Sequence, residues 1–439
     1  MYDYIVAGGG PTGITLSLML SQTNYKVLVL EKSDSLGGCW KVEYLEETYM
    51  TEHSPKVLFR YSSKYFKKLL KILDVEPKFK SVYFKSKMKN MILSIQFLLY
   101  NLTIRDYIML CKYYIQYIFN IHDRHINVND WCIKNKISKS GTKCIDILSI
   151  TINNIPKRFR FEALFITLLD SKAALSIDQL SHPNEWIDKA EAIIEKSKNI
   201  TVMYDSNLTK VIKDDDIITQ VLVNNLEYYS CSRDVFLCVP IQNVLQICKS
   251  SNIMTNWFSS SEEFEHYTQS STLNAIGIQL HFDKKMKQPE KWFWSQFSPW
   301  NIILVDKSNT MEVISYDKNV KSVWSCVLID LESKGENKSV NECNDKDEII
   351  SELLLQLEKL YKSDLRPIKV TFADIERKEG KWYSEVTSFS DMYGDLKPKG
   401  KINNLYSIGP HNIRGAVTID HAIQSALNVS RSHDFPKIM

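Results

Sequence analysis

Short apolar runs and one glycine-rich turn alternate along the first forty residues. Tyr4 to Ala7 is an apolar run that predicts a buried strand, and the segment Ile14 to Leu20 predicts a helix. Tyr25 to Leu30 predicts a second buried strand, and Glu31 stands at its end. This order of strand, turn, helix and strand is typical of a dinucleotide-binding unit.

The turn before the helix has the sequence Gly8-Gly9-Gly10-Pro11-Thr12-Gly13. Gly8 allows a tight turn, Gly10 lets a pyrophosphate approach the backbone, and Gly13 lets the helix pack close to the strand. The helix N-terminus offers N–H groups to phosphate oxygens. Glu31 falls near the roughly twenty-residue offset at which a carboxylate accepts ribose hydroxyls. The pattern predicts a dinucleotide site formed by Gly8, Gly10, Pro11, Thr12, Gly13, Glu31 and Lys32.

A second strand–turn–helix pattern ends the chain. Asn404 to Ile408 predicts a buried strand, and Gly409 follows it in a turn. From Val417 to Ser430 the apolar residues recur at helical spacing. A strand that leads into a helix N-terminus again favours an anionic ligand.

Two glycine motifs resemble those of a known FAD-binding superfamily. Leu36-Gly37-Gly38-Cys39-Trp40 is similar to the second glycine pair of the glutathione-reductase-like superfamily. The C-terminal segment resembles the FAD motif of flavin amine oxidases, protoporphyrinogen oxidases and phytoene desaturases. Cys39 stands where an arginine is common, and Pro410 stands where an acidic residue is common. The resemblance implies FAD as cofactor, with contacts from Gly38, Cys39, Trp40 and Gly409 and from the backbone near Ile419 and Asp420.

The middle of the chain resembles the same group in part. Glu52-His53-Ser54-Pro55 is similar to the Glu-x-Gly-Pro-Arg segment beside the isoalloxazine ring in protoporphyrinogen oxidases, with Ser54 and Lys56 as replacements. Segments 200–204, 208–212 and 219–223 are expected to form a β-meander, in which the resemblance places Leu208 against adenine.

The expected fold class is α/β, with a Rossmann-like FAD-binding domain and a discontinuous α+β substrate domain. We assign residues 1–64, 197–256 and 384–439 to the FAD-binding domain, and 65–196 and 257–383 to the substrate domain. The first insertion has a helical pattern, whereas the second has alternating segments such as Ala275 to Phe282 and Thr310 to Ile314.

Composition narrows the partners and the compartment. The net charge of +3 gives no reason to expect nucleic acid. Nine cysteines without a CxxC pair suggest reduced packing thiols and, with no leader pattern at Met1, a cytoplasmic protein. Met91 to Ile104 comes closest to a membrane span but contains polar residues, so we expect a core or interfacial helix and leave peripheral membrane contact and oligomeric state open.

Candidate substrate and metal residues are less specific. Trp294 and Trp300 belong to an aromatic cluster that forms either a substrate wall or a packed core, and Trp382 stands where amine oxidases keep an aromatic cage residue. His53 is a further substrate candidate through its motif. His122, Asp123 and His125 have an incomplete spacing for zinc, so we expect solvated residues and no metal site.

The working hypothesis is a two-electron oxidation of a small organic substrate, either an amine or a desaturable C–C or C–N bond. Hydride passes to flavin N5, and O2 or another acceptor reoxidises the flavin. No catalytic residue is assigned, and the strand Ala275 to Phe282 lacks the lysine usual in amine oxidases. Two alternatives remain: a non-redox flavin-dependent mutase, which would need arginines such as Arg158, Arg160 and Arg366, and a flavin-bound interaction module without catalysis.

Overall fold

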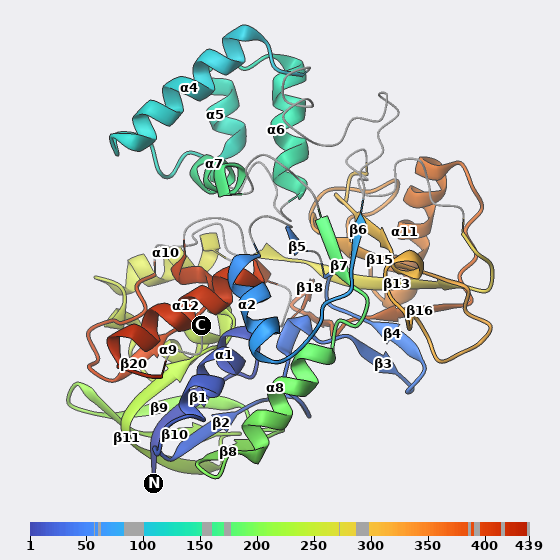
Figure 1. The fold of residues 1–439 in the computed structure, drawn as a ribbon. Helices are drawn as coiled ribbons and strands as arrows, with labels where there is room; N and C mark the ends of the chain where they lie inside the picture. Colours follow the sequence, from blue (N-terminus) through green and yellow to red (C-terminus); the bar gives the residue numbers. More distant parts are fainter. Residues whose placement is uncertain are drawn as a thin grey trace.

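The computed structural model describes residues 1–436 apart from 57, 60–62, 83–100, 152–159, 171–176, 272, 287–297, 385–387, 390–395 and 414–417. Its main sheet has seven strands in the order β8-β2-β1-β11-β10-β9, with β20 also paired to β11 (Figure 1). Its parallel part contains β1 (Tyr2–Ala7), β2 (Val27–Leu30), β8 (Ile200–Met203), the second half of β11 (Glu227–Leu237) and β20 (Leu405–Ser407). The antiparallel part adds β9 (Leu208–Asp214) and β10 (Ile217–Val223) to the first half of β11.

Both faces of the parallel sheet are buried, because alternate residues of each strand enter two separate cores. Tyr4 and Val6 of β1 face one core, and Ile5 and Ala7 face the other. The first core contains side chains of α1 (Pro11–Leu20), α2 (Lys64–Ile72), α8 (Glu185–Lys196) and α12 (Ile419–Ser432). The second contains side chains of α9 (Ile241–Ser250) and α10 (Ser261–Ser271). The predicted α/β class with a Rossmann-like sheet is confirmed.

A second, antiparallel sheet lies beside the first (Figure 1). Its order is β14 (Ile303–Asp306), β15 (Ser322–Leu328), β13 (Ile276–Phe282) and β16 (Lys369–Phe372). Apolar side chains of the sheet pack against α11 (Lys346–Tyr361) in a third core. The smaller strands are β3 (Glu43–Leu45), β4 (Tyr49–Thr51), β5 (Leu58–Phe59), β6 (Phe79–Val82), β7 (Ile177–Leu180), β12 (Leu273–Asn274), β17 (Glu376–Lys378), β18 (Lys381–Tyr383) and β19 (Ser388–Phe389).

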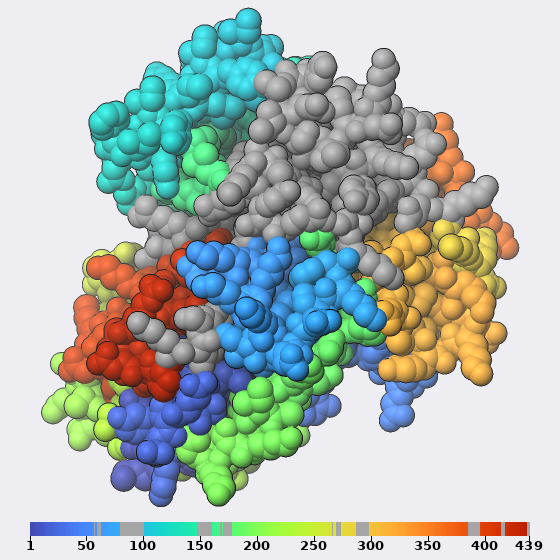
Figure 2. Space-filling model, viewed as in Figure 1, coloured from blue at the N-terminus to red at the C-terminus, as the bar shows by residue number. Residues whose placement is uncertain are grey.

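Four helices form a lobe of their own (Figures 1 and 2). They are α4 (Ile104–Ile118), α5 (Val128–Lys134), α6 (Lys139–Thr151) and α7 (Phe161–Asp170). Aromatic rings join α4, α5 and α7: Trp131 stacks on Phe161 at 3.7 Å between ring centroids, and Tyr113 meets Phe161 edge-on at 4.7 Å.

Three local expectations were wrong. Segment 200–204 supplies β8, which pairs in parallel with β2 and is no part of the meander. Thr310 to Ile314 forms no strand, because Asp306 caps a short 3-10 helix, Lys307–Asn309, that ends β14. His122 is buried instead of lying in solvent, and its Nε2 is within hydrogen-bond distance, 3.0 Å, of a Glu162 carboxylate oxygen.

The packing of three helices is relevant to the expected division of the chain into an FAD-binding and a substrate domain. Helix α8 and all but the first residue of α2 lie inside the segment 65–196, expected to form part of the substrate domain. Helix α10 lies in the second expected segment, 257–383. All three contribute side chains to the two cores of the main sheet. Among the described helices, none is long and apolar enough to cross a membrane.

Candidate dinucleotide-binding site

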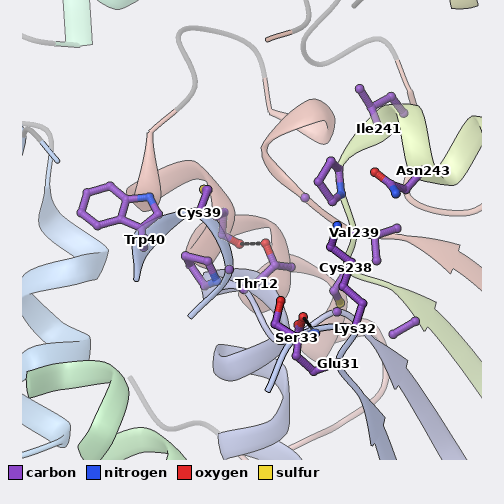
Figure 3. Close-up of a pocket in the computed structure, with 18 of the residues that line it drawn as sticks. Thr12, Glu31, Lys32, Ser33, Cys39, Trp40, Cys238, Val239, Ile241 and Asn243 are labelled. Atoms are coloured by element: carbon purple, nitrogen blue, oxygen red, sulfur yellow. Dashed lines mark hydrogen bonds between the residues drawn. The ribbon is translucent and has the colours of Figure 1, made fainter. Parts of the chain in front are cut away.

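A cavity of about 440 Å³ lies where the carboxyl ends of β1, β2 and β11 meet the N-termini of α1 and α12 (Figure 3). Its lining comes from three distant parts of the sequence, residues 7–56, 206–250 and 408–422. A crevice at the carboxyl ends of parallel strands is the usual ligand site of an open α/β sheet. Of the residues predicted from the sequence, those that line it are Gly8, Gly10, Pro11, Thr12, Glu31, Lys32, Gly38, Cys39, Trp40, His53, Leu208, Gly409 and Ile419.

The glycines of the first turn, Gly10 and Gly13, have different structural roles. A Cβ on Gly10 would meet no atom within 4 Å, so the backbone at the start of α1 opens directly onto the cavity. A Cβ on Gly13 would lie 1.8 Å from the carbonyl oxygen of Gly8, which is why the helix can approach the strand so closely. No side chain caps α1, and its first N–H groups remain available to an anion.

Glu31 stands at the end of β2, where its buried carboxylate borders the cavity (Figure 3). One oxygen accepts a hydrogen bond from the Gly9 N–H at 2.6 Å, and the other accepts one from the Ser33 N–H at 2.9 Å. These two bonds fix the carboxylate in place. Each oxygen keeps a further lone pair, so Glu31 can still accept hydroxyl groups of a ligand.

The second glycine pair passes directly beside the first turn. The Gly37 N–H donates to the Gly9 carbonyl oxygen at 2.8 Å, and a Cβ on Gly38 would lie 3.1 Å from the Gly10 Cα. Cys39 and Trp40 follow as part of the cavity wall (Figure 3). Burial raises the pKa of the Cys39 thiol, and all nine cysteines are free. Cys39 is therefore a protonated wall residue and has no disulfide partner.

The C-terminal motif closes the opposite side. The Gly409 N–H donates to Asn412 Oδ1 at 2.9 Å, which fixes the turn after β20. His411 lies 2.8 Å from Ser407 Oγ through Nε2, and burial lowers the pKa of this imidazole to about 4, so it is neutral at pH 7. Thr12 Oγ1 donates to the Ala422 carbonyl oxygen at 3.3 Å and ties α1 to α12.

Asp420 lies in the first turn of α12, but its side chain serves another helix. Its Oδ1 accepts the Phe66 N–H at 2.8 Å, at the start of α2, where Ser63 supplies no cap. Burial raises the pKa of Asp420 to about 6, although N–H groups of α2 partly offset this. The Asp420 carboxylate therefore caps α2 and does not line the cavity.

The second sheet supplies the wall that contains residues 52–56. A Cβ on Gly277 of β13 would lie 2.4 Å from the His53 carbonyl oxygen, so this segment crosses β13 at very close range. Gln279 of β13 donates to the Glu52 carbonyl oxygen at 2.8 Å. The Glu52 carboxylate pairs with Lys307 at 3.0 Å, and both side chains are almost completely buried.

His53 and Lys56 bring two basic groups to this wall. Burial lowers the pKa of His53 to about 3, and the charges of Lys56 and Lys32 act in the same direction. Burial also lowers the pKa of Lys56, against the opposing effect of Glu52. Within the described part of the chain, Lys56 Nζ has no hydrogen-bond partner.

The tryptophans expected near a substrate are placed elsewhere or lie outside the described residues. Trp300 and Trp382 are buried in the core between the second sheet and α11, where Trp382 Nε1 donates to the Cys343 carbonyl oxygen at 2.9 Å. Neither lines the cavity. Trp294 and Arg158 lie outside the described residues. Arg160 and Arg366 are described and do not line the cavity either.

Sequence reasoning missed several polar residues of the lining. Asn207 and Thr209 flank Leu208, and Asn243 and Gln246 lie in the first turns of α9. The sequence did contain a signal for them, because β11 is a third strand that leads through Val239-Pro240 into a helix N-terminus. Pro240 is the N-cap residue of α9, and no side chain caps this helix. Three helices thus begin at the cavity.

Comparisons with known proteins agree with this architecture. Residues 6–73 match the family described as NAD(P)-binding Rossmann-like domain. Over 44 residues the chain is 43% identical to an uncharacterized oxidoreductase, CzcO, from Bacillus subtilis, a match that covers 10% of this chain and 13% of that protein. The chain therefore spans a small part of this curated relative.

Solved structures match over nearly the whole chain. An oxidoreductase from Methanosarcina mazei gives a TM-score of 0.66 at 11% identity, covering 98% of this chain and 100% of the other. A protein assigned as a protoporphyrinogen oxidase from Exiguobacterium gives a TM-score of 0.65 at 13% identity, covering 99% of this chain and 98% of the other. Putrescine oxidase bound to putrescine gives a TM-score of 0.61 at 14% identity, and the match covers 99% of each chain.

These matches define the class of structure. The chain has the fold of amine oxidase and protoporphyrinogen oxidase structures, with a Rossmann-like unit at its N-terminus. At 11–14% identity the likeness concerns the fold alone.

Proposed function

We propose that the chain is an FAD-dependent oxidoreductase, which passes a hydride from an amine or a desaturable C–C or C–N bond of a small organic substrate to flavin N5, with reoxidation by O2 or another acceptor. The observation that carries the proposal is the cavity itself. It joins the glycine cradle of α1 to the start of α12, and so offers one continuous site to a long, doubly charged cofactor.

The residues present fit FAD at both ends of the cavity. The open backbone at Gly10 and the adjacent Gly38 would hold the pyrophosphate, because neither has a side chain to displace it. Glu31 would accept the adenosine ribose hydroxyls. Leu208 would contact the adenine, and Gly409 would lie along the ribityl chain. The helix N-terminus at Ile419 would favour negative charge on the flavin by about 0.3–2 kcal/mol.

The wall from residues 53 to 56 would border the reacting end. His53 stays neutral at pH 7, so the basic group that can carry charge there is Lys56. The burial that lowers the Lys56 pKa brings its proton exchange closer to neutral pH than that of an exposed lysine. Lys56 can thus hold a proton or stabilise negative charge beside the bound molecules.

The test is an anaerobic titration of the purified, flavin-loaded protein with candidate amines, porphyrinogens and polyenes. Bleaching of the flavin absorbance by one class, followed by recovery of colour when O2 or another acceptor is admitted, is the expected result. A protein that holds FAD but is bleached by dithionite and by none of these donors would contradict the redox proposal while leaving the cofactor site intact.

A further inference from the structure

Helix α4 of the helical lobe has apolar side chains on two opposite faces. One face is buried, because Tyr113 packs against Phe161, Phe165 and Trp131. The opposite face is exposed. Its residues recur at intervals of three and four, which places them in one line along the helix. We call this line the α4 stripe: Ile104, Ile108, Cys111, Ile115, Ile118 and Phe119.

The exposure of the α4 stripe is high for such large side chains. Ile104 is 81% exposed, Ile118 58% and Phe119 70%, and Ile121 just beyond the helix is 70% exposed. Figure 2 shows α4 at the outer surface of the lobe. A soluble surface does not require a continuous apolar line of this length, and such lines mark contact surfaces.

The exposed charged residues of α4 itself are all basic. Arg105 and Lys112 are exposed beside it. The acidic residue of α4, Asp106, is fully buried and is used for capping, with bonds to the Thr103 and Ser138 N–H groups. No carboxylate of α4 therefore reaches its surface. The sequence before α4 also lacks carboxylates. Residues 91–103 contain no charged residue, and the basic residues Lys85, Lys87 and Lys89 precede them.

A second copy of the chain is a poorer partner for this surface than a lipid bilayer. In a two-fold antiparallel pairing of α4 stripes, the two Lys112 side chains would meet near the axis, since Lys112 stands at the middle of the stripe. Like charges in direct contact oppose association. An anionic lipid surface instead accepts the apolar side chains between its headgroups and attracts Arg105 and Lys112.

We propose that the α4 stripe lies in the interface of an anionic membrane and attaches the protein peripherally, with α4 parallel to the bilayer plane. At 1.5 Å per residue the helix extends about 22 Å along that plane. This attachment is independent of the cofactor chemistry proposed above.

The test is co-sedimentation of the flavin-loaded full chain with vesicles of phosphatidylcholine alone and of phosphatidylcholine with about one third phosphatidylserine. The wild-type protein should sediment with the anionic vesicles. The double variant Ile115→Ser/Ile118→Ser should lose at least about tenfold in vesicle affinity. The matched control is Ile217→Ser/Leu226→Ser, at the β9–β10 turn and the β10–β11 turn, where the side chains are 50% and 80% exposed. It should sediment like the wild type.

A second pair of variants separates charge from apolar contact. Arg105→Gln/Lys112→Gln should weaken binding to anionic vesicles and reduce its sensitivity to salt. Light scattering and thermal unfolding should be unchanged in all variants, since every substituted side chain is exposed. Two results would overturn the proposal: stripe variants that sediment like the wild type, or a wild-type dimer that the stripe variant converts to a monomer, which would identify a second copy as the partner.

Discussion

The two walls of the cavity are built by different means. At the α1 end the backbone defines the site: Gly13 has no room for a Cβ, whereas Gly10 has open space above it, three residues earlier in the same turn. At the opposite wall, Gln279 of the second sheet and Lys307, just after β14, hold residue 52 through a hydrogen bond and a buried ion pair. The first wall depends on short-range sequence, and the second depends on contacts between distant segments.

The largest expected effect is a difference in stability between alanine substitutions at the two glycines of the first wall, Gly13 and Gly10. In Gly13→Ala the new Cβ would overlap the Gly8 carbonyl oxygen, so we expect a loss of more than about 4 kcal/mol in the free energy of unfolding, or no folded protein. Gly10→Ala should fold normally, because its φ of −73° suits any residue. Denaturant unfolding followed by circular dichroism measures both. Equal stability of the two variants would contradict the account of this turn.

The next effect concerns the ion pair of the second wall. Glu52→Gln leaves Lys307 buried without its partner, which should cost about 3–5 kcal/mol in unfolding free energy. The double variant Glu52→Gln/Lys307→Met should recover much of that loss, because both charges are removed together. As a control, Glu332→Gln breaks the exposed pair with Lys381 and should change stability by less than about 1 kcal/mol. Similar losses for the buried and the exposed pair would argue against a structural role for Glu52.

A third effect is the dependence of stability on pH. Burial lowers the pKa of His411 to about 4 in the folded protein, below the ordinary 6.5, so the unfolded chain binds the proton first as pH falls. The neutral, buried His411 therefore makes its full contribution to the free energy of unfolding above pH 6.5. About 3 kcal/mol of this contribution is lost as the pH falls towards 4. His53 and His281 act with the same sign.

The unfolding free energy of His411→Asn, measured from pH 7.5 to pH 4.5, should therefore fall less steeply than that of the wild type. His125→Gln is the control, because His125 is exposed. Parallel pH profiles for His411→Asn and the wild type would show that burial of His411 does not set this dependence.

The smallest effect tests the cap that joins α12 to α2. Asp420→Ala removes the acceptor for the Phe66 N–H, and in denaturant unfolding near pH 3.5, where the carboxyl group carries little charge, it should cost about 1 kcal/mol. Asp420→Asn keeps an acceptor and removes the charge. Since the folded pKa is raised to about 6, the wild type carries a charge penalty that grows as pH rises from 3.8 through 6, and Asp420→Asn should lack it. Neither variant should lose cofactor if the carboxylate serves only α2.

The sequence was sufficient for the parts of the fold that depend on local pattern. The β1–α1–β2 unit and α12 lie within a few residues of their predicted positions, because glycine spacing and apolar periodicity are short-range signals. The same signals could not show that 200–204 joins the parallel sheet, since an apolar run does not specify the direction of its neighbour.

The opposite wall could not have been predicted. Glu52 and Lys307 are far apart in the chain, and they meet only because β15 pairs with both β13, which contacts residues 52 and 53, and β14, which leads into Lys307. Trp300 and Trp382 show the same limit, because an aromatic cluster in a sequence does not reveal whether it faces a cavity or a core. The α4 stripe shows the same limit, because both faces of α4 are apolar and only the contact of Tyr113 with Phe161 determines which face is buried.

The most direct test of the central claim is to identify the cofactor. The protein is purified, its visible spectrum is recorded, and the nucleotide released on denaturation is identified, alongside a Gly10→Val variant whose side chain would project into the open space of the cradle. The account predicts near-stoichiometric FAD from the wild type, and a folded Gly10→Val protein with little or none. A colourless wild-type protein that takes up no added FAD, or one that releases only a nicotinamide dinucleotide, would contradict it.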